Sequence, residues 1–153
     1  MNVLVVYSSK FGNTERLARA IGTALESTAT VRVVEAGPAE NIHGDGVDLL
    51  IVGAPTQVHG LLLGVRGFLR RLKDRGFSGR RAAAFDTRMA GDISKTGSAA
   101  QVIGRMLKRA GLTLVVAPES FLVADYEGPL ADREEARAMN WAQRVAAFEG
   151  ALP

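Results

Sequence analysis

The chain has 153 residues, of which 47% are apolar and 23% are charged, as in an ordinary globular protein with one sizeable core. It contains no cysteine, which excludes disulfides, thiolate catalysis and Cys-ligated metals, so redox chemistry would need a bound cofactor. No apolar run approaches the roughly 20 residues of a membrane span, and the N-terminus shows no signal peptide. We therefore expect a single domain over residues 1–153, located in the cytoplasm.

The first 25 residues contain a strand, a polar loop and a helix. Val3–Val6 is apolar and mostly β-branched, which is typical of a strand buried on both faces of a parallel sheet. Apolar residues recur every four positions over 17–25 and predict an amphipathic helix, with Asn13 or Thr14 as its N-cap. The loop between them, 8–12, places two hydroxyls, a cation and a glycine before a helix N-terminus. That arrangement favours an anion, most often a phosphate.

Strands and helices alternate along the rest of the chain. Apolar runs predict further strands at 30–35, 47–53, 80–86 and 112–117, the last resuming at 121–123 after a break at Pro118. Helices are expected at 65–72 before Gly76, at 98–110, and after a capping box formed by Asp132 and Glu135, with Trp141 and Phe148 on the buried face of the last helix. This alternation predicts an α/β fold with a doubly wound, five-stranded parallel sheet and helices on both faces.

Ligands of an open parallel sheet bind beyond the carboxyl ends of its strands. Three polar loops are expected there: the first loop (Ser9–Thr14), the second loop (Pro55–Gly60) and the third loop (Thr87–Gly97). The first loop offers hydroxyls and amide groups to a phosphate. The other two loops are long enough to frame a flat ligand.

Several other site motifs are absent from the sequence. A P-loop requires GxxxxGK[ST], but Gly12 is followed by Asn13 and Thr14, and no GxGxxG is present. Ser8 and Ser9 stand where a response-regulator receiver would have acidic Mg²⁺ ligands. No GxSxG nucleophile elbow occurs. These absences exclude the corresponding nucleotide hydrolases, receivers and serine hydrolases.

The segment Tyr7–Glu15 (YSSKFGNTE) resembles the phosphate-binding loop of the flavodoxins, which bind FMN. Gly53–Thr56 resembles the opening of the family's second flavin loop, and the resemblance covers nearly the whole chain. Further segments look like a flavodoxin-domain branch common in actinobacteria: Phe85–Arg88, Gly97–Ala99, Glu119–Val123 and Gly128–Leu130. The resemblance implies the strand order 2-1-3-4-5 and electron transfer through bound FMN.

The resemblance also implies a set of cofactor-binding residues and no catalytic residue or metal site. The side chains of Ser9, Asn13 and Thr14 would contact the FMN phosphate, and Lys10, Phe11 and Gly12 would add backbone amides. Pro55, Thr56, Gln57, Val58, His59 and Gly60 would lie against the isoalloxazine ring, and Thr87, Arg88 and Met89 would line its other side. Two roles stay open: His59 tunes the flavin or is solvated, and Arg88 offsets flavin charge or pairs with Asp86.

Two features depart from well-known flavodoxins. Those proteins usually hold the ring between aromatic side chains, whereas the second and third loops contain no Trp, Tyr or Phe, so we expect weaker flavin binding. Typical flavodoxins are also strongly acidic, whereas this chain has a net charge of +3. We therefore expect a redox partner with an acidic face, or a small anionic or quinone-like reactant, and no nucleic-acid partner.

The positive charge is concentrated at residues 66–81, which contain seven Arg or Lys residues and only Asp74 against them. A solvated helix face is the simplest explanation of such a run. Two alternatives to an electron carrier stay open. One is a flavin-dependent reductase or dehydrogenase acting on a quinone or a protoporphyrinogen-like substrate. The other is a cofactor-free interaction module that uses the basic 66–81 face.

Overall fold

The computed structural model describes residues 1–39, 41–57 and 60–149. Within these ranges six strands form one parallel sheet: β1 (Asn2–Tyr7), β2 (Thr30–Glu35), β3 (Leu49–Pro55), β4 (Arg81–Met89), β5 (Thr113–Leu114) and β6 (Glu119–Val123). The order is β2-β1-β3-β4-β5, and β6 also pairs with β4. The predicted α/β class and the 2-1-3-4-5 order are therefore confirmed.

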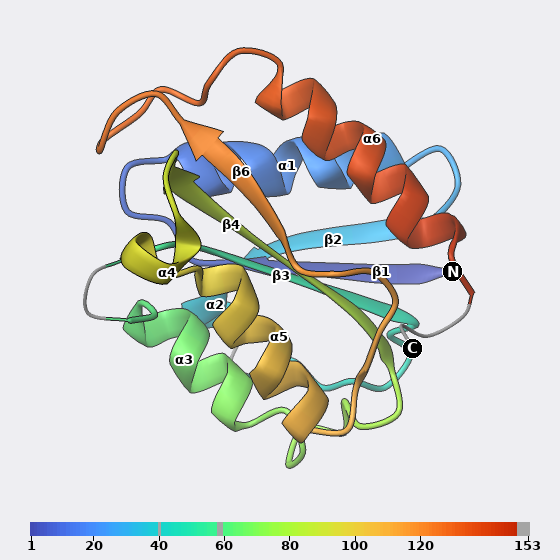
Figure 1. Ribbon diagram of the computed structural model, residues 1–153. Helices are drawn as coiled ribbons and strands as arrows, with labels where there is room; N and C mark the ends of the chain where they lie inside the picture. The colour runs from blue at the N-terminus through green and yellow to red at the C-terminus, as the bar shows by residue number, and fades with distance from the viewer. Residues whose placement is uncertain (40, 58–59, 150–153) are drawn as a thin grey trace.

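Helices cover both faces of this sheet (Figure 1). The described helices are α1 (Asn13–Leu25), α2 (Ala36–Ala39), α3 (Leu63–Arg70), α4 (Ile93–Thr96), α5 (Ala99–Arg109) and α6 (Glu134–Ala147). In Figure 1, α1 and α6 lie over one face, and α3 and α5 lie over the other. None of these described helices has the length and apolar character needed to cross a membrane.

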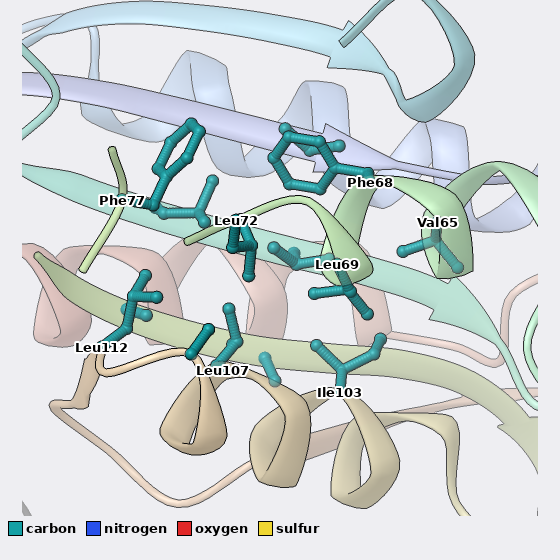
Figure 2. Close-up of a cluster of buried hydrophobic side chains, with 14 of the residues drawn as sticks. Val65, Phe68, Leu69, Leu72, Phe77, Ile103, Leu107 and Leu112 are labelled. Atoms are coloured by element: carbon teal, nitrogen blue, oxygen red, sulfur yellow. The ribbon is translucent and has the colours of Figure 1, made fainter. Parts of the chain in front are cut away.

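The central strands are buried on both faces because their apolar residues are consecutive rather than alternating. Along β1, Leu4 and Val6 pack into the core beneath α3 and α5, whereas Val3 and Val5 pack into the core beneath α1 and α6. Figure 2 shows part of the first core, in which Val65, Phe68, Leu69, Leu72 and Phe77 face Ile103, Leu107 and Leu112. Both cores position the carboxyl ends of β1, β3 and β4 side by side.

The fifth position of the sheet is a broken strand, as the sequence predicts, but its longer part follows the break. β5 pairs with Arg81 and Ala82, and β6 pairs with residues 85–89. Between these pairings β4 contains residues 83–84, whereas the fifth position contains residues 115–118. The extra residues leave the ladder and bring Pro118, which has no amide to donate, against Gly104 of α5.

Strands β3 and β4 extend further toward the site than predicted. The strand expected at 47–53 begins at Leu49 and continues through Pro55, which pairs with Thr87. The strand expected at 80–86 continues to Met89 because β6 pairs with it there. Thr87, Arg88 and Met89 are therefore strand residues rather than loop residues, and they have fixed positions at the edge of the site.

Three helix-end predictions are wrong. The N-cap of α1 is Gly12 rather than Asn13 or Thr14, and the Ser9 side chain, not an N-cap side chain, accepts from the first turn. The proposed Asp132 capping box does not form, because α6 begins at Glu134 after Arg133 adopts a positive φ of 67°. The helix expected at 65–72, with Gly76 as its C-terminal cap, spans Leu63–Arg70 and has Arg71 as its C-cap. Tertiary contacts set two of these ends: the first loop at α1, and at α6 a half-buried ion pair between Arg137 and Glu134.

That ion pair fastens α6 to β6. The guanidinium of Arg137 donates to both carboxylate oxygens of Glu134, to Glu119 at 2.8 Å and to the Ser120 carbonyl. It also lies over the Phe121 ring, 4.4 Å from the ring centroid. Hydrogen bonds from Arg137, and another from the backbone, hold the pKa of Glu134 below its usual range despite burial. The sequence predicted that Trp141 and Phe148 are both in the core. Trp141 is buried, as predicted, but Phe148, just beyond the end of α6, is 42% exposed.

Candidate functional site

The first loop turns at Gly12, which adopts the left-handed region with φ 91° and allows α1 to begin immediately afterwards. The hydroxyl oxygen of Ser9 accepts from the amides of Gly12, at 3.1 Å, and Glu15, at 3.3 Å. Because both bonds use oxygen lone pairs, the hydroxyl hydrogen of Ser9 stays available to another acceptor. Ser9 therefore shapes the loop and keeps one donor.

Four backbone amides of the first loop indicate an anion-binding site. Among the described residues, none accepts a hydrogen bond from the amides of Lys10, Phe11, Asn13 or Thr14. Two of these amides precede the left-handed Gly12 and two follow it, at the N-terminus of a helix of 13 residues. Such a concave set of amide donors attracts anions and is a common phosphate cradle.

The hydroxyl of Thr14 is buried and lies 2.8 Å from the hydroxyl of Thr87. One of the two hydroxyls donates to the other, so one hydrogen of the pair remains free. This contact joins the start of α1 to the end of β4, two segments separated by 73 positions. It places Thr87, which the sequence assigned to the ring side, beside the first loop.

A turn that the sequence analysis did not assign to the site lies against the first loop. We call residues 124–130, between β6 and α6, the tyrosine turn. The side chain of Asn13 donates to the carbonyl of Glu127 at 3.0 Å, and Gly128 leaves space for that side chain. The ring of Tyr126 contacts Phe11 edge-on, with centroids 5.3 Å apart. The only sequence signal for this turn was the resemblance of Gly128–Leu130 to family members, and that resemblance did not indicate that the turn lies beside the first loop.

Asp86 holds the second loop, the end of β4 and the start of α5 together. This residue is fully buried, and its Oδ2 accepts from Ser98 Oγ at 2.6 Å, the Ala100 amide at 2.9 Å and Thr56 Oγ1 at 3.2 Å. The oxygen of Thr56 in turn accepts from the Ala99 amide at 2.9 Å. A helix N-terminus stabilises a carboxylate in this position. Asp86 therefore joins these three segments at the edge of the site.

Two adjoining cavities open at this edge. The narrow cavity, of about 40 Å³, is lined by Ser9, Lys10, Phe11, Asn13, Thr14, Pro55, Thr56, Gln57, Thr87, Arg88, Met89, Val123 and Tyr126. The wide cavity, of about 610 Å³, is lined by Thr56, Gln57, Gly60, Leu61, Arg88, Met89, Lys95, Thr96, Gly97, Ser98, Ala99, Val102 and Tyr126. The structure thus brings together nearly all the candidate site residues. Val58 and His59 lie outside the described residues, and Gly12 forms the turn of the first loop.

Arg88 borders both cavities and does not form an ion pair with Asp86 among the described residues. Its Nη1 donates to the carbonyls of Met89, at 3.2 Å, and Gly91, at 3.0 Å. Its Nε is buried and has no partner in the described part of the chain. This donor is therefore unpaired within the described residues, but it is enclosed rather than open to the cavities. Further along this loop the Ser94 amide lowers the pKa of Asp92, which caps α4.

Fold and site together define an open α/β protein with its ligand cleft at the switch point beside β1, where the strand order reverses. The family comparison agrees with this class. The chain belongs to the flavodoxin domain family, whose model matches residues 4–117. No curated protein matches the chain.

Solved structures share the fold at low sequence identity. An archaeal flavodoxin matches with a TM-score of 0.75 and 23% identity, over 95% of this chain and 96% of its own. Oxidised flavodoxin 1 from Bacillus cereus matches with a TM-score of 0.79 and 18% identity, over 98% and 100%. Rubredoxin oxygen:oxidoreductase from Desulfovibrio gigas matches with 0.72 and 21%, over 95% of this chain but 35% of that longer one.

Proposed function

We propose that this chain is a cytoplasmic electron carrier that binds FMN, with the cofactor's phosphate in the first loop. The observation that carries this proposal is the set of unpaired amides of Lys10, Phe11, Asn13 and Thr14 at the narrow cavity. The hydroxyls of Ser9 and Thr14 line the same cavity. Charge-assisted bonds from such donors to a dianionic ester are stronger than neutral ones.

The wide cavity fits the flat part of the same cofactor. It adjoins the narrow cavity through Thr56, Gln57, Arg88, Met89 and Tyr126, which border both. Its lining combines apolar groups with few polar ones, as ligand cavities usually do. FMN, when bound, supplies one- and two-electron chemistry, and the chain supplies anchoring and charge. The positive charge of Arg88, which borders both cavities, would then offset negative charge on the reduced cofactor.

Purified protein should take up one equivalent of FMN and bind riboflavin at least about tenfold more weakly, because riboflavin lacks the phosphate. The measurement is a flavin titration of apoprotein followed by absorbance and fluorescence. Equal affinity for the two flavins would contradict a phosphate site in the first loop. Protein that never acquires a flavin spectrum would overturn the proposed function.

A reductase is the second candidate, because the wide cavity of about 610 Å³ also has room for a small reactant at its opening. Turnover separates the two candidates. A carrier holds its electrons until a protein partner arrives, whereas a reductase oxidises NAD(P)H or a quinol continuously without one. The FMN-loaded protein from the same titration serves for this assay.

The basic 66–81 stretch does not form one continuous face. Arg81 donates to the Phe148 carbonyl, and Arg66 lies near Gly60. Three exposed cations, Arg70, Lys73 and Arg109, instead line a groove of about 300 Å³ between α3 and α5 with Leu69, Asp74, Met106 and Ala110. This α3–α5 groove lies at the far end of both helices from the cavities. We infer that this groove attracts the acidic face of a redox partner, which then exchanges electrons at the opening of the cavities.

Electron transfer with an acidic redox protein should therefore slow as salt is raised, since screening weakens attraction between exposed charges. The double variant Lys73→Glu/Arg109→Glu should slow it several-fold at low salt. Stopped-flow absorbance measures both effects, and the FMN titration of this variant should match wild type because neither residue lines a cavity. An unchanged rate in the variant would argue against docking on the groove.

A further inference from the structure

Tyr126 is an exposed aromatic residue that borders both cavities. Tyr126 is 54% exposed, and it lines both the narrow cavity and the wide cavity. Leaving so large an apolar ring in water forgoes the favourable free energy of burial. An exposed ring at the junction of two ligand cavities is a surface that a ligand can cover.

The tyrosine turn holds this residue in place without help from the protein core. The Tyr126 amide donates to Asp125 Oδ1 at 2.8 Å, and the Gly128 amide donates to the Asp125 carbonyl at 3.0 Å. The base of the turn is closed by a bond of 2.8 Å from the Ala124 amide to the Pro129 carbonyl. These bonds fix the backbone of the turn at the mouth of the site.

The first loop then fixes the ring itself. Phe11 contacts it at an interplanar angle of 65°, and Lys10 Nζ lies 5.8 Å from its centroid and 3.4 Å from its hydroxyl. The Asn13 side chain ties the same turn to the first loop through Glu127. Residues of the expected phosphate site therefore determine where the Tyr126 ring lies. A tyrosine with no role beyond covering the surface would not need these contacts with the first loop.

We propose that Tyr126 is the aromatic wall of the FMN site. It takes the place of the aromatic side chains that the second and third loops lack, although it comes from the turn after β6. The inference rests on the proposed function, because FMN is the ligand whose phosphate and ring would occupy the two cavities. The ring of Tyr126 would contact the cofactor where its ribityl chain meets the isoalloxazine.

The test compares Tyr126→Leu with Tyr126→Phe in FMN titrations of the full chain. Loss of the ring should weaken FMN binding about fivefold to tenfold and brighten the emission of the bound flavin, because an electron-rich ring in contact with a flavin quenches it. The Phe variant keeps the ring and should recover most of the affinity. Phe148→Leu makes the same kind of change at an exposed ring outside both cavities, and should titrate like wild type.

The outcomes separate this inference from the function on which it rests. Wild type that binds FMN while Tyr126→Leu matches it in affinity and emission overturns the aromatic wall and leaves the carrier proposal standing. Wild type that binds no FMN overturns both. Weaker binding with brighter emission in Tyr126→Leu alone supports the wall, and an equal loss in Phe148→Leu would assign the effect to general surface change and overturn it.

Discussion

Replacing Asp86 with alanine should lower the free energy of unfolding by about 3 to 4 kcal/mol. The carboxylate is fully buried, and its Oδ2 accepts from Thr56, Ser98 and the Ala100 amide. Alanine would leave these three donors without their acceptor in a largely buried site. It would also remove the negative charge that stabilises the N-terminus of α5. Chemical denaturation followed by circular dichroism measures the loss.

Two further variants separate the causes of this loss. Asp86→Asn keeps an acceptor of the same shape but removes the charge, so it should cost about 1 to 2 kcal/mol. Asp92→Ala removes another helix-capping aspartate, at the exposed four-residue helix α4, and should destabilise the fold far less than Asp86→Ala. A loss in Asp86→Ala no larger than in Asp92→Ala would show that the buried network contributes little.

The Asp86→Ala variant should also weaken flavin binding, because Asp86 joins the elements that border the wide cavity. Thr56, Ser98 and Ala99 line that cavity and form a single hydrogen-bonded network with Asp86. Without the carboxylate, the second loop and the start of α5 would no longer be held at a fixed separation. The network thus connects the stability of the fold to the shape of the site.

The sequence predicted the layers and the first loop because these depend on local patterns. Consecutive apolar residues mark buried parallel strands, and a four-residue period marks α1. The expectation that the first loop binds an anion follows from its residue types and from its position before a helix. The family resemblance supplied the strand order that local patterns leave open.

The parts of the site that sequence reasoning missed depend on contacts between distant segments. β4 continues to Met89 because residues 121–123 pair with it, and no local pattern in 87–89 indicates that pairing. Tyr126 is exposed, and its place beside Phe11 results from the path of the turn after β6, which no local pattern indicates. The cap of α1 failed for a similar reason: Ser9, four residues before the helix begins, accepts the Glu15 amide.

Removing the hydroxyls of Ser9 and Thr14 together should weaken FMN binding about 100-fold or more. Each hydroxyl keeps or shares one hydrogen that can be donated to a phosphate oxygen, and a hydrogen bond to a charged group contributes about 1.5 to 3 kcal/mol. We expect the double variant Ser9→Ala/Thr14→Val to lose about 1 to 2 kcal/mol of stability as well. That loss follows because the Gly12 and Glu15 amides lose an acceptor and Thr87 loses its partner.

Riboflavin separates a phosphate contact from a general disturbance of the loop. It carries the same ring but no phosphate, so its affinity should differ little between wild type and the double variant, whereas the affinity for FMN should fall steeply. The control Thr23→Ala removes an exposed hydroxyl from α1 itself and should alter neither titration. An equal loss of both flavins would mean that Ser9 and Thr14 shape the cavity without binding the anion. The backbone amides of the first loop would then hold the phosphate, and the affinity for FMN would depend on the turn at Gly12 rather than on side-chain hydroxyls.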